Sequence, residues 1–522
     1  MTTSFETDPK SENQAAVSVP ISKVLMIVAL SAVFFGIAVW MVVPAPPSGF
    51  SWDDAWYLLM AEWLTPESNF RVLAWTMLWV TSYPPLFPLL IAWSGAGLAD
   101  QQSAFILNAL FLALGSGVAM FWFAREGFSS LTITLAAMLL VFNPVTLGYL
   151  PILFSEFLFS FLFMITLALA CSRQDWKWNS KWVVIGIIIG LSVATRSAGW
   201  ALVAGVLLHL VFNRKLLPMA AFIAGLAVGI LAIPFLMVGL PPPAVNYMDQ
   251  LLGNLGNLGW DFLVQQIKGL LLGWSMLWGW GAGPWLAAIA VLPGFFIRLK
   301  SNRIDAWIVV MYLGMLLVWP WPGHMGRFLW PLLPCFLVSV HSSFGFLKNS
   351  KYRTIMASVL MGLIVLLSVP DGIGRSLERL LDTPKGELFL LSRMHEWTRS
   401  GTREEGISKL KERQQMLQDL KRVAELVDPK ACIYSEMSPL VSVRTLKVAY
   451  PSLWNSLDKA GLTKIRCEYY YMLPDSISGA NLDSVNRFAN AHEELFRSYS
   501  SNETEDELPL GVFLRFRPLN AE

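Results

Sequence analysis

The sequence predicts an α-helical polytopic membrane protein with a small C-terminal extracytoplasmic α/β domain. Of its 522 residues, 55% are hydrophobic and only 15% are charged, and the mean hydropathy is +0.52. This composition differs from that of soluble globular domains and of disordered chains. The apolar residues form long runs as far as Pro370, and the composition then becomes charge-rich. These observations predict about eleven transmembrane helices and a separate tail.

The apolar runs have lengths near the roughly 17 to 25 residues that cross about 30 Å of hydrocarbon. They cover residues 24–44, 103–124, 131–149, 152–171, 182–195, 198–212, 216–240, 275–297, 306–322, 328–347 and 354–370. Only Arg196 and Ser197 separate two short runs, which are expected to form a tight hairpin with a polar tip. The first run is too long for a cleavable signal peptide, and no small-residue cleavage site precedes Pro44.

Residues 83–98 allow two interpretations, because this uncharged piece is shorter than the other runs. It is either a further span or a short helix that lies at the interface or is half inserted. It opens with Tyr83-Pro84-Pro85, and Pro88 follows. These prolines favour the short helix.

Basic residues alternate between the loops in a way that predicts the orientation. The loops expected to be cytoplasmic carry Arg125, Arg173, Lys177, Lys181, Arg214, Lys215, Arg298, Lys300, Arg303, Lys348, Lys351 and Arg353. The short outer loops carry only Arg71, Arg196, Lys268 and Arg327. The positive-inside rule then places the N-terminus in the cytoplasm and the tail outside. We expect a multi-pass protein of the bacterial inner (plasma) membrane, with its site and C-terminal domain on the periplasmic or extracellular side.

Three regions follow from this arrangement. Residues 1–22 form a polar, disordered cytoplasmic N-terminus, and residues 23–370 form the transmembrane domain, with a first outer loop at 45–102. Residues 371–522 form the α/β domain. Its pattern predicts helices at 401–427, 452–460 and 482–499, and strands at 431–435, 465–472 and 511–517.

The four cysteines divide between these regions. Cys171 and Cys335 lie in apolar runs, where a thiol acts as a small apolar residue. Cys432 and Cys467 share the outer domain, and they can form a disulfide in an oxidising compartment, although the sequence leaves the pairing open. No zinc-ligand spacing, phosphate-binding lysine loop, dinucleotide fingerprint or serine-hydrolase elbow is present. The net charge of +2 and the lack of a basic stripe outside the cytoplasmic loops argue against nucleic-acid binding.

Candidate chemistry lies at the predicted outer face. Asp53 and Asp54 follow the first apolar run, where one carboxylate can take a proton and the other can hold substrate or shift its neighbour's pKa. The alternative is a hydrated loop at a helix end. Glu156 lies about one turn into an apolar run, which is costly without a polar partner. It could position an acceptor, pair with Arg196 or Arg327, or help to hold a divalent metal.

Five segments together resemble the GT-C membrane glycosyltransferases. Residues 53–57 (DDAWY) are similar to the D-[DE]-x-x-Y signature in the first outer loop of family 39 protein O-mannosyltransferases and lipid A aminoarabinose transferases. Residues 83–90 resemble the Pro-rich segment that follows, and Ser155-Glu156 resembles the second outer-loop acid. Residues 194–196 resemble the [LA]-T-[RK] turn, and residues 326–334 the R-[YF]-x-x-P-x-x-P segment. Asp54 stands where many relatives have Glu, and Glu156 where others have Asp.

The resemblance implies an inverting glycosyltransferase that takes a sugar from a polyprenyl-phosphate carrier. Asp53 would be the base, and Asp54 and Tyr57 would orient acceptor or sugar. The further substrate-binding candidates are Tyr83, Glu156, Arg196, Lys268, His324 and Arg327. The last four are the outer-face cations available to bind the phosphate. For each arginine, the alternative role is anchoring a helix end against lipid headgroups.

The implied partners are the polyprenyl-phosphate sugar donor, membrane lipids and an acceptor that is a protein, lipid or glycan. The residues point to no particular cofactor, and a divalent metal is possible. Two other function classes stay open at this point. One is a secondary transporter, for which intramembrane acids and broken helices are expected. The other is a non-catalytic membrane assembly protein of the cell envelope.

Overall fold

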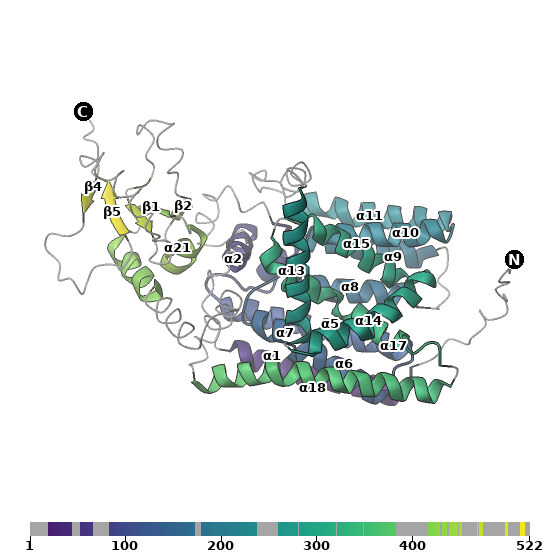
Figure 1. Ribbon diagram of the computed structural model, residues 1–522. Helices are drawn as coiled ribbons and strands as arrows, with labels where there is room; N and C mark the ends of the chain where they lie inside the picture. Colours follow the sequence, from purple (N-terminus) through teal and green to yellow (C-terminus); the bar gives the residue numbers. More distant parts are fainter. Residues whose placement is uncertain are drawn as a thin grey trace.

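The structure is a computed structural model that describes most of the helical region and parts of the tail (Figure 1). The described residues are 19–43, 53–65, 83–172, 179–236, 259–279, 281–319, 321–347, 349–382, 416–428, 431–435, 438–446, 448–451, 467, 469–472, 496–498 and 512–516. Predictions for residues 1–18, 401–415, 452–460 and 482–495 lie outside them, as do those for Arg71, Arg173, Lys177 and Lys348.

Long apolar helices form the main body of the molecule. They are α1 (Ile21–Val42), α5 (Gln101–Arg125), α6 (Ser130–Phe142), α8 (Glu156–Ala170), α9 (Ser180–Thr195), α10 (Gly199–Phe212), α11 (Leu216–Leu236), α14 (Gly283–Lys300), α15 (Ile304–Leu317), α17 (Leu333–Ser342) and α18 (Ser350–Asp382). Each predicted apolar run overlaps one of them. In the described residues, five helical segments are long and apolar enough to cross a membrane: Ile21–Val42, Gln101–Arg125, Ser130–Tyr149, Gly283–Lys300 and Lys351–Pro370. The helical polytopic fold class is confirmed.

Glycines bring α9 and α11 into close backbone contact. Gly186 and Gly190 lie on α9, four residues apart, and Gly225 and Gly229 repeat that spacing on α11. A Cβ added at Gly190 would lie 2.7 Å from the Gly229 Cα, and one at Gly229 would lie 2.7 Å from the Ile187 carbonyl oxygen. Such close approach is how helices associate where lipid removes the hydrophobic driving force between them.

The predicted span at 275–297 is wrong at its start. Residues 275–278 belong to a separate helix, α13 (Trp260–Trp278), and α14 begins at Gly283. Gly279 and Gly281 have φ angles of 77° and 74°, which glycine adopts without steric cost, so the backbone turns there. In Figure 1, α13 runs steeply across the direction of the long helices.

Short helices and turns connect the long helices along the chain. They are α2 (Asp53–Leu64), α4 (Leu86–Trp93), α7 (Pro144–Tyr149), α16 (Met325–Leu329) and the 3-10 turns η4 (Pro322–His324) and η5 (Trp330–Leu332). The eight residues of α4 are too few to cross a bilayer, which agrees with the short-helix interpretation of residues 83–98. The expected hairpin is also present, because α9 ends at Thr195 and α10 begins at Gly199.

The tail contains a mixed five-stranded sheet. Its strands are β1 (Cys432–Ser435), β2 (Val448–Pro451), β3 (Tyr469–Met472), β4 (Phe496–Ser498) and β5 (Val512–Phe516), in the order β2-β1-β3-β5-β4. β1 is parallel to β2 and β3, and β5 is antiparallel to β3 and β4. Central register pairs are Tyr434 with Tyr450 and Tyr470, and Tyr470 with Leu514.

The tail agrees with the sequence pattern in part. β1, β3 and β5 lie within the predicted strands, and Cys432 and Cys467 form a disulfide with a Cα–Cα distance of 4.7 Å. The predicted helix at 482–499 is wrong at its end, where pairing with β5 makes residues 496–498 a strand. Helix α21 (Ser438–Thr445) and β2 were not predicted, and α18 continues through Pro370 to Asp382.

Replacing Gly225 with Ala is expected to destabilise the bundle by about 1–3 kcal/mol, because the new methyl group would collide with the backbone at Val183. Gly314→Ala is the matched control, since it lies in α15 and nothing is within 4 Å of its added Cβ. That change should be neutral or stabilising by up to about 1 kcal/mol. Thermal unfolding of the purified variants in detergent measures both, and equal midpoints would contradict the close-packing interpretation.

Candidate active site

Four charged side chains, distant in sequence, meet at the end of the helical bundle and are called the charged cluster here. They are Asp53 at the start of α2, Glu156 at the start of α8, Arg196 at the end of α9 and Arg327 on α16. Arg327 and Glu156 are 8% and 4% exposed. Buried charges of this kind persist only when they are paired and hydrogen-bonded.

Arg327 is the centre of the charged cluster. Its Nη2 lies 2.5 Å from Asp53 Oδ2, and its Nε donates to Glu156 Oε1. Arg196 Nη1 lies 2.7 Å from the other oxygen, Glu156 Oε2. Glu156 therefore joins the two arginines, and Arg327 joins the two acids.

Hydroxyl groups and one aromatic ring hold the charged cluster in place. Tyr83 OH donates a hydrogen bond of 2.8 Å to Asp53 Oδ1. Ser155 Oγ is 2.8 Å from Tyr57 OH and accepts a hydrogen bond of 3.2 Å from Arg196 Nη1. The Arg327 guanidinium carbon lies 3.7 Å from the centre of the Phe154 ring, a distance suited to cation–π attraction.

The helix ends stabilise three of these charges through the helix dipole. Asp53 is in the first turn of α2 and Glu156 in the first turn of α8, where the helix dipole stabilises a negative charge. Arg196 is the C-cap residue of α9, where the dipole stabilises a positive charge. Pro322 and Pro331 flank the short α16 that carries Arg327.

The environment of Asp53 acts on its pKa in two directions. Burial alone would raise the pKa of this carboxyl. The charge and hydrogen bond of Arg327, the hydrogen bond of Tyr83 and the more distant charge of Arg196 outweigh burial, so the pKa of Asp53 is lowered. Asp53 is therefore a carboxylate at neutral pH and can accept a proton.

The other candidate residues lie outside the charged cluster. Asp54 is fully buried, and its Oδ1 accepts a hydrogen bond of 2.9 Å from the Ala55 N–H. His324 is half-buried one turn before Arg327, with its ring centre 6.4 Å from that of Phe328. Lys268 is exposed on α13 and is not part of the buried charged cluster.

Metal binding was left open by the sequence. Within the part of the chain that the structure describes, no three His, Cys, Asp or Glu side chains are grouped closely enough to hold a metal ion. The carboxylates of Asp53 and Glu156 are instead paired with arginines.

Several residues of the site were not predicted from the sequence. Phe154 packs under Arg327, and Ser155 links Tyr57 to Arg196. Both directly precede Glu156 in the sequence, so the neighbourhood of a buried acid was the available signal. Tyr149 also lines a small pocket beside Glu156 and Arg327, and no local pattern indicated this position.

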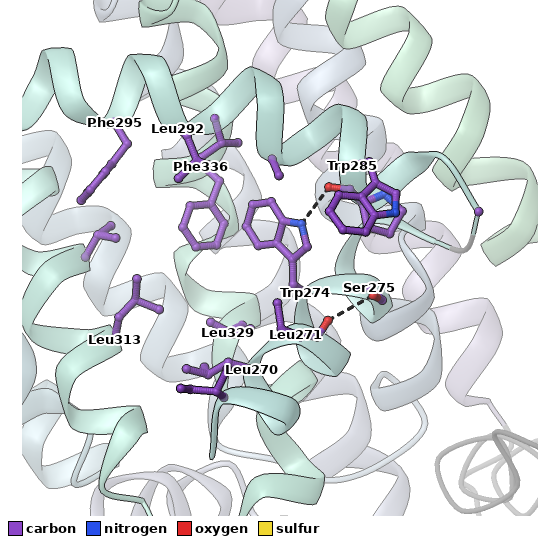
Figure 2. Close-up of a pocket in the computed structure, with 16 residues that line it drawn as sticks. Leu270, Leu271, Trp274, Ser275, Trp285, Leu292, Phe295, Leu313, Leu329 and Phe336 are labelled. Atoms are coloured by element: carbon purple, nitrogen blue, oxygen red, sulfur yellow. Dashed lines mark hydrogen bonds between the residues drawn. The ribbon is translucent and has the colours of Figure 1, made fainter. Parts of the chain in front are cut away.

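An apolar cavity of about 620 Å³ lies on the other side of α16. Figure 2 shows Trp274 of α13, Trp285 and Leu292 of α14, and Phe336 of α17 around it. Trp274 Nε1 donates a hydrogen bond of 2.9 Å to the Pro284 carbonyl, which joins α13 to the start of α14. Leu329 lines this cavity, although Arg327, two residues earlier, belongs to the charged cluster.

The fold is similar to that of a known protein. The structure of ArnT from Cupriavidus metallidurans bound to undecaprenyl phosphate matches with a TM-score of 0.51 and 12% sequence identity, covering 94% of this chain and 98% of that one. The apo structure of the same protein gives a TM-score of 0.47 and 12% identity, with coverages of 95% and 98%. No protein-family model and no curated protein matches the sequence. The chain thus has the fold of ArnT.

Because the pKa of Asp53 is lowered, this carboxyl should stay ionised at and above about pH 4, near the ordinary aspartate value, and its protonation should limit no activity there. Removing the charge in Arg327→Met leaves burial as the stronger influence, so the acid limb of the residual activity should move to higher pH. The measurement is kcat/KM against pH for both proteins. A limb that stays unmoved in the variant would show that another group titrates there.

Proposed function

We propose that this chain is an inverting glycosyltransferase that moves a sugar from a polyprenyl-phosphate donor to an acceptor at the outer face of the membrane. The observation that carries the proposal is that α16 has the charged cluster on one side and an apolar cavity on the other. Arg327 lies in the charged cluster, and Leu329 lines the apolar cavity. A polyprenyl phosphate needs these two environments next to each other, one for its phosphate and one for its chain.

The arginines keep hydrogen-bond donors for a phosphate. Among the described residues, Arg327 uses Nε and Nη2 for Glu156 and Asp53, and Arg196 uses Nη1 for Ser155 and Glu156. A guanidinium has five N–H donors, so both side chains have others to offer. Phosphate gains negative charge as the glycosidic bond breaks, and a fixed guanidinium at a low-dielectric boundary stabilises that charge.

The apolar cavity suits a prenyl chain. Some of its lining residues are also exposed on the outside of the helical region: Ile267 and Leu271 on α13, and Trp285 and Leu292 on α14. In a bilayer, these side chains would face lipid, so a prenyl chain could enter sideways between α13 and α14. The binding of undecaprenyl phosphate by the similarly folded ArnT supports the same assignment.

Asp53 is the proposed base. Its carboxylate would take the proton of an acceptor hydroxyl or amine, whose heavy atom attacks the anomeric carbon. The bond between that carbon and the phosphate oxygen breaks, and the phosphate leaves with the electron pair. While Asp53 is paired with Arg327, its lowered pKa makes it a weak base. A phosphate that attracts Arg327 would weaken this pair and make Asp53 more basic.

Tyr57, Tyr83 and Glu156 are proposed to position the reacting groups, and Lys268 and His324 remain candidates for the donor headgroup. The basic loops support an outer-face site in a bacterial inner (plasma) membrane, with 371–522 as the outer domain. The disulfide between Cys432 and Cys467 supports an oxidising compartment for that domain.

The first prediction of this proposal is that Asp53→Asn abolishes transfer while polyprenyl-phosphate binding persists. The amide is nearly isosteric with the carboxylate but cannot accept the proton, so the loss should appear in kcat. The matched control is Asp100→Asn, because Asp100 is an exposed N-cap of α5 and asparagine caps equally well.

The assay uses detergent-purified protein with polyprenyl-phosphate sugar and no ion gradient, which separates an enzyme from a transporter. Sugar transfer or hydrolysis by the parent protein, with the Asp100 variant unchanged, supports the proposal. If Asp53→Asn retained turnover within about threefold of the parent, Asp53 would not be the base. A parent protein that neither transfers nor hydrolyses the sugar would favour the transporter or assembly-protein alternatives.

The second prediction concerns the cavity. Ala288→Phe should fill part of it and raise KM about tenfold for a long prenyl chain, because several buried methylene groups lose their contacts. KM for a two-isoprene donor and kcat for both donors should change little. Ile289→Phe is the matched control, since Ile289 is the next residue of α14 and is 71% exposed outside the cavity. Equal effects of the two variants would remove the cavity as the prenyl site.

A further inference from the structure

Asp54 is adjacent to the proposed base, but its surroundings differ from those of Asp53. Asp53 points to Arg327 and Tyr83, whereas Asp54 is fully buried and hydrogen-bonds to the Ala55 N–H. A buried carboxylate is costly unless a positive charge compensates it. The guanidinium on which the Asp54 charge acts belongs to Arg444, in the last turn of α21 in the tail.

Helix α21 lies between the sheet and α2, as Figure 1 shows. On one side it packs against β1 and β2, and on the other it packs against α2. Among the described helices, α4 and α21 form the extensive packing contacts of α2. The tail therefore supplies one of the two helices that hold the element carrying Asp53.

The electrostatics of Arg444 fit this contact. Arg444 is half-buried in a helix whose neighbouring residues Val441 and Val443 are buried. Burial lowers the pKa of Arg444 to about 10, and the negative charge of Asp54 opposes that shift. Arg444 is thus still positively charged at neutral pH, on a helix that packs against the one carrying the buried Asp54.

We propose that Arg444 on α21 holds Asp54 and thereby sets the position of α2, so that Asp53 faces Arg327. Arg444 is a positioning residue under this proposal, and Asp54 acts through α2 rather than on substrate. The inference rests on the proposed transferase function for its catalytic consequence. It assigns the tail a part in building the site.

Helix geometry explains why such a contact matters for the reaction. Side-chain ends lie roughly 6 Å from a helix axis, so a rotation of about 10° moves them by about 1 Å. A misplacement of that size can cost about a hundredfold in rate. Asp53 and Asp54 are consecutive residues in the first turn of α2. A contact that fixes the direction of Asp54 therefore fixes the direction of Asp53.

A double-mutant cycle tests the proposal in the full-length protein. Arg444→Met and Asp54→Asn should each lower kcat about tenfold, with the affinity for polyprenyl phosphate within about twofold of the parent. The double variant should be no worse than the poorer single variant, because both changes break one interaction. Arg444→Lys should recover most of kcat. Lys421→Met is the control, since Lys421 is exposed on the 416–426 helix of the tail.

Amide hydrogen exchange supplies a readout that does not depend on activity. Arg444→Met should raise exchange in residues 53–65, while the amides of β1 and β3 keep the protection of the parent protein. If Arg444→Met raised exchange in α2 but the parent protein had no transferase activity, the proposed function would be overturned and the contact would stand. Unchanged α2 exchange would overturn the contact. Additive losses in the cycle, or a raised acceptor KM in Asp54→Asn alone, would instead make Asp54 a substrate-binding residue.

Discussion

The ion pairs of Arg327 are the interaction on which the rest of the site depends. They join α16 to α2 and α8 through partners 274 and 171 residues away in the sequence. Removing one member of a buried ion pair costs about 3–5 kcal/mol, because the remaining charge loses its compensation. The charged cluster therefore requires all four helix ends to meet, and the loops between the long helices must allow it. The two arginines keep further N–H donors that these ion pairs do not use.

Helices α13 and α16 lie between the charged cluster and the apolar cavity. One side of α16 presents Arg327 to the acids, and the other side presents Leu329 to an apolar cavity. Gly269 and Gly273 of α13 allow close backbone approach, since a Cβ at either would lie within 3 Å of η4 or α16. An amphiphilic donor would be recognised at both ends by this arrangement. The breaks at Gly279 and Gly281 are what free α13 to lie across the long helices.

The tail is joined to the helical region through a first-loop helix instead of standing apart. The sheet packs on α21, and α21 packs on α2, which carries Asp53. Asp53 pairs with Arg327 in the bundle, and the helix that carries both acids packs against α21 of the tail, where we propose that Arg444 holds Asp54. Adjacent acids often invite the interpretation of a catalytic pair, but the surroundings of these two acids differ. Helix α2 therefore connects the charged cluster to the tail.

The sequence by itself determined the membrane-spanning helical class, the short helix near Pro88, the strands β1, β3 and β5, and the acids and arginines that form the charged cluster. Run length, charge placement and residue alternation are local properties, so a single sequence displays them. Only the tertiary structure decided that Arg327 lies between Asp53 and Glu156, that Phe154 packs beneath it, that α13 is separate from α14, and that α21 packs against α2. These features depend on which distant segments pack together, and each ion pair forms only where packing buries both charges within hydrogen-bond reach.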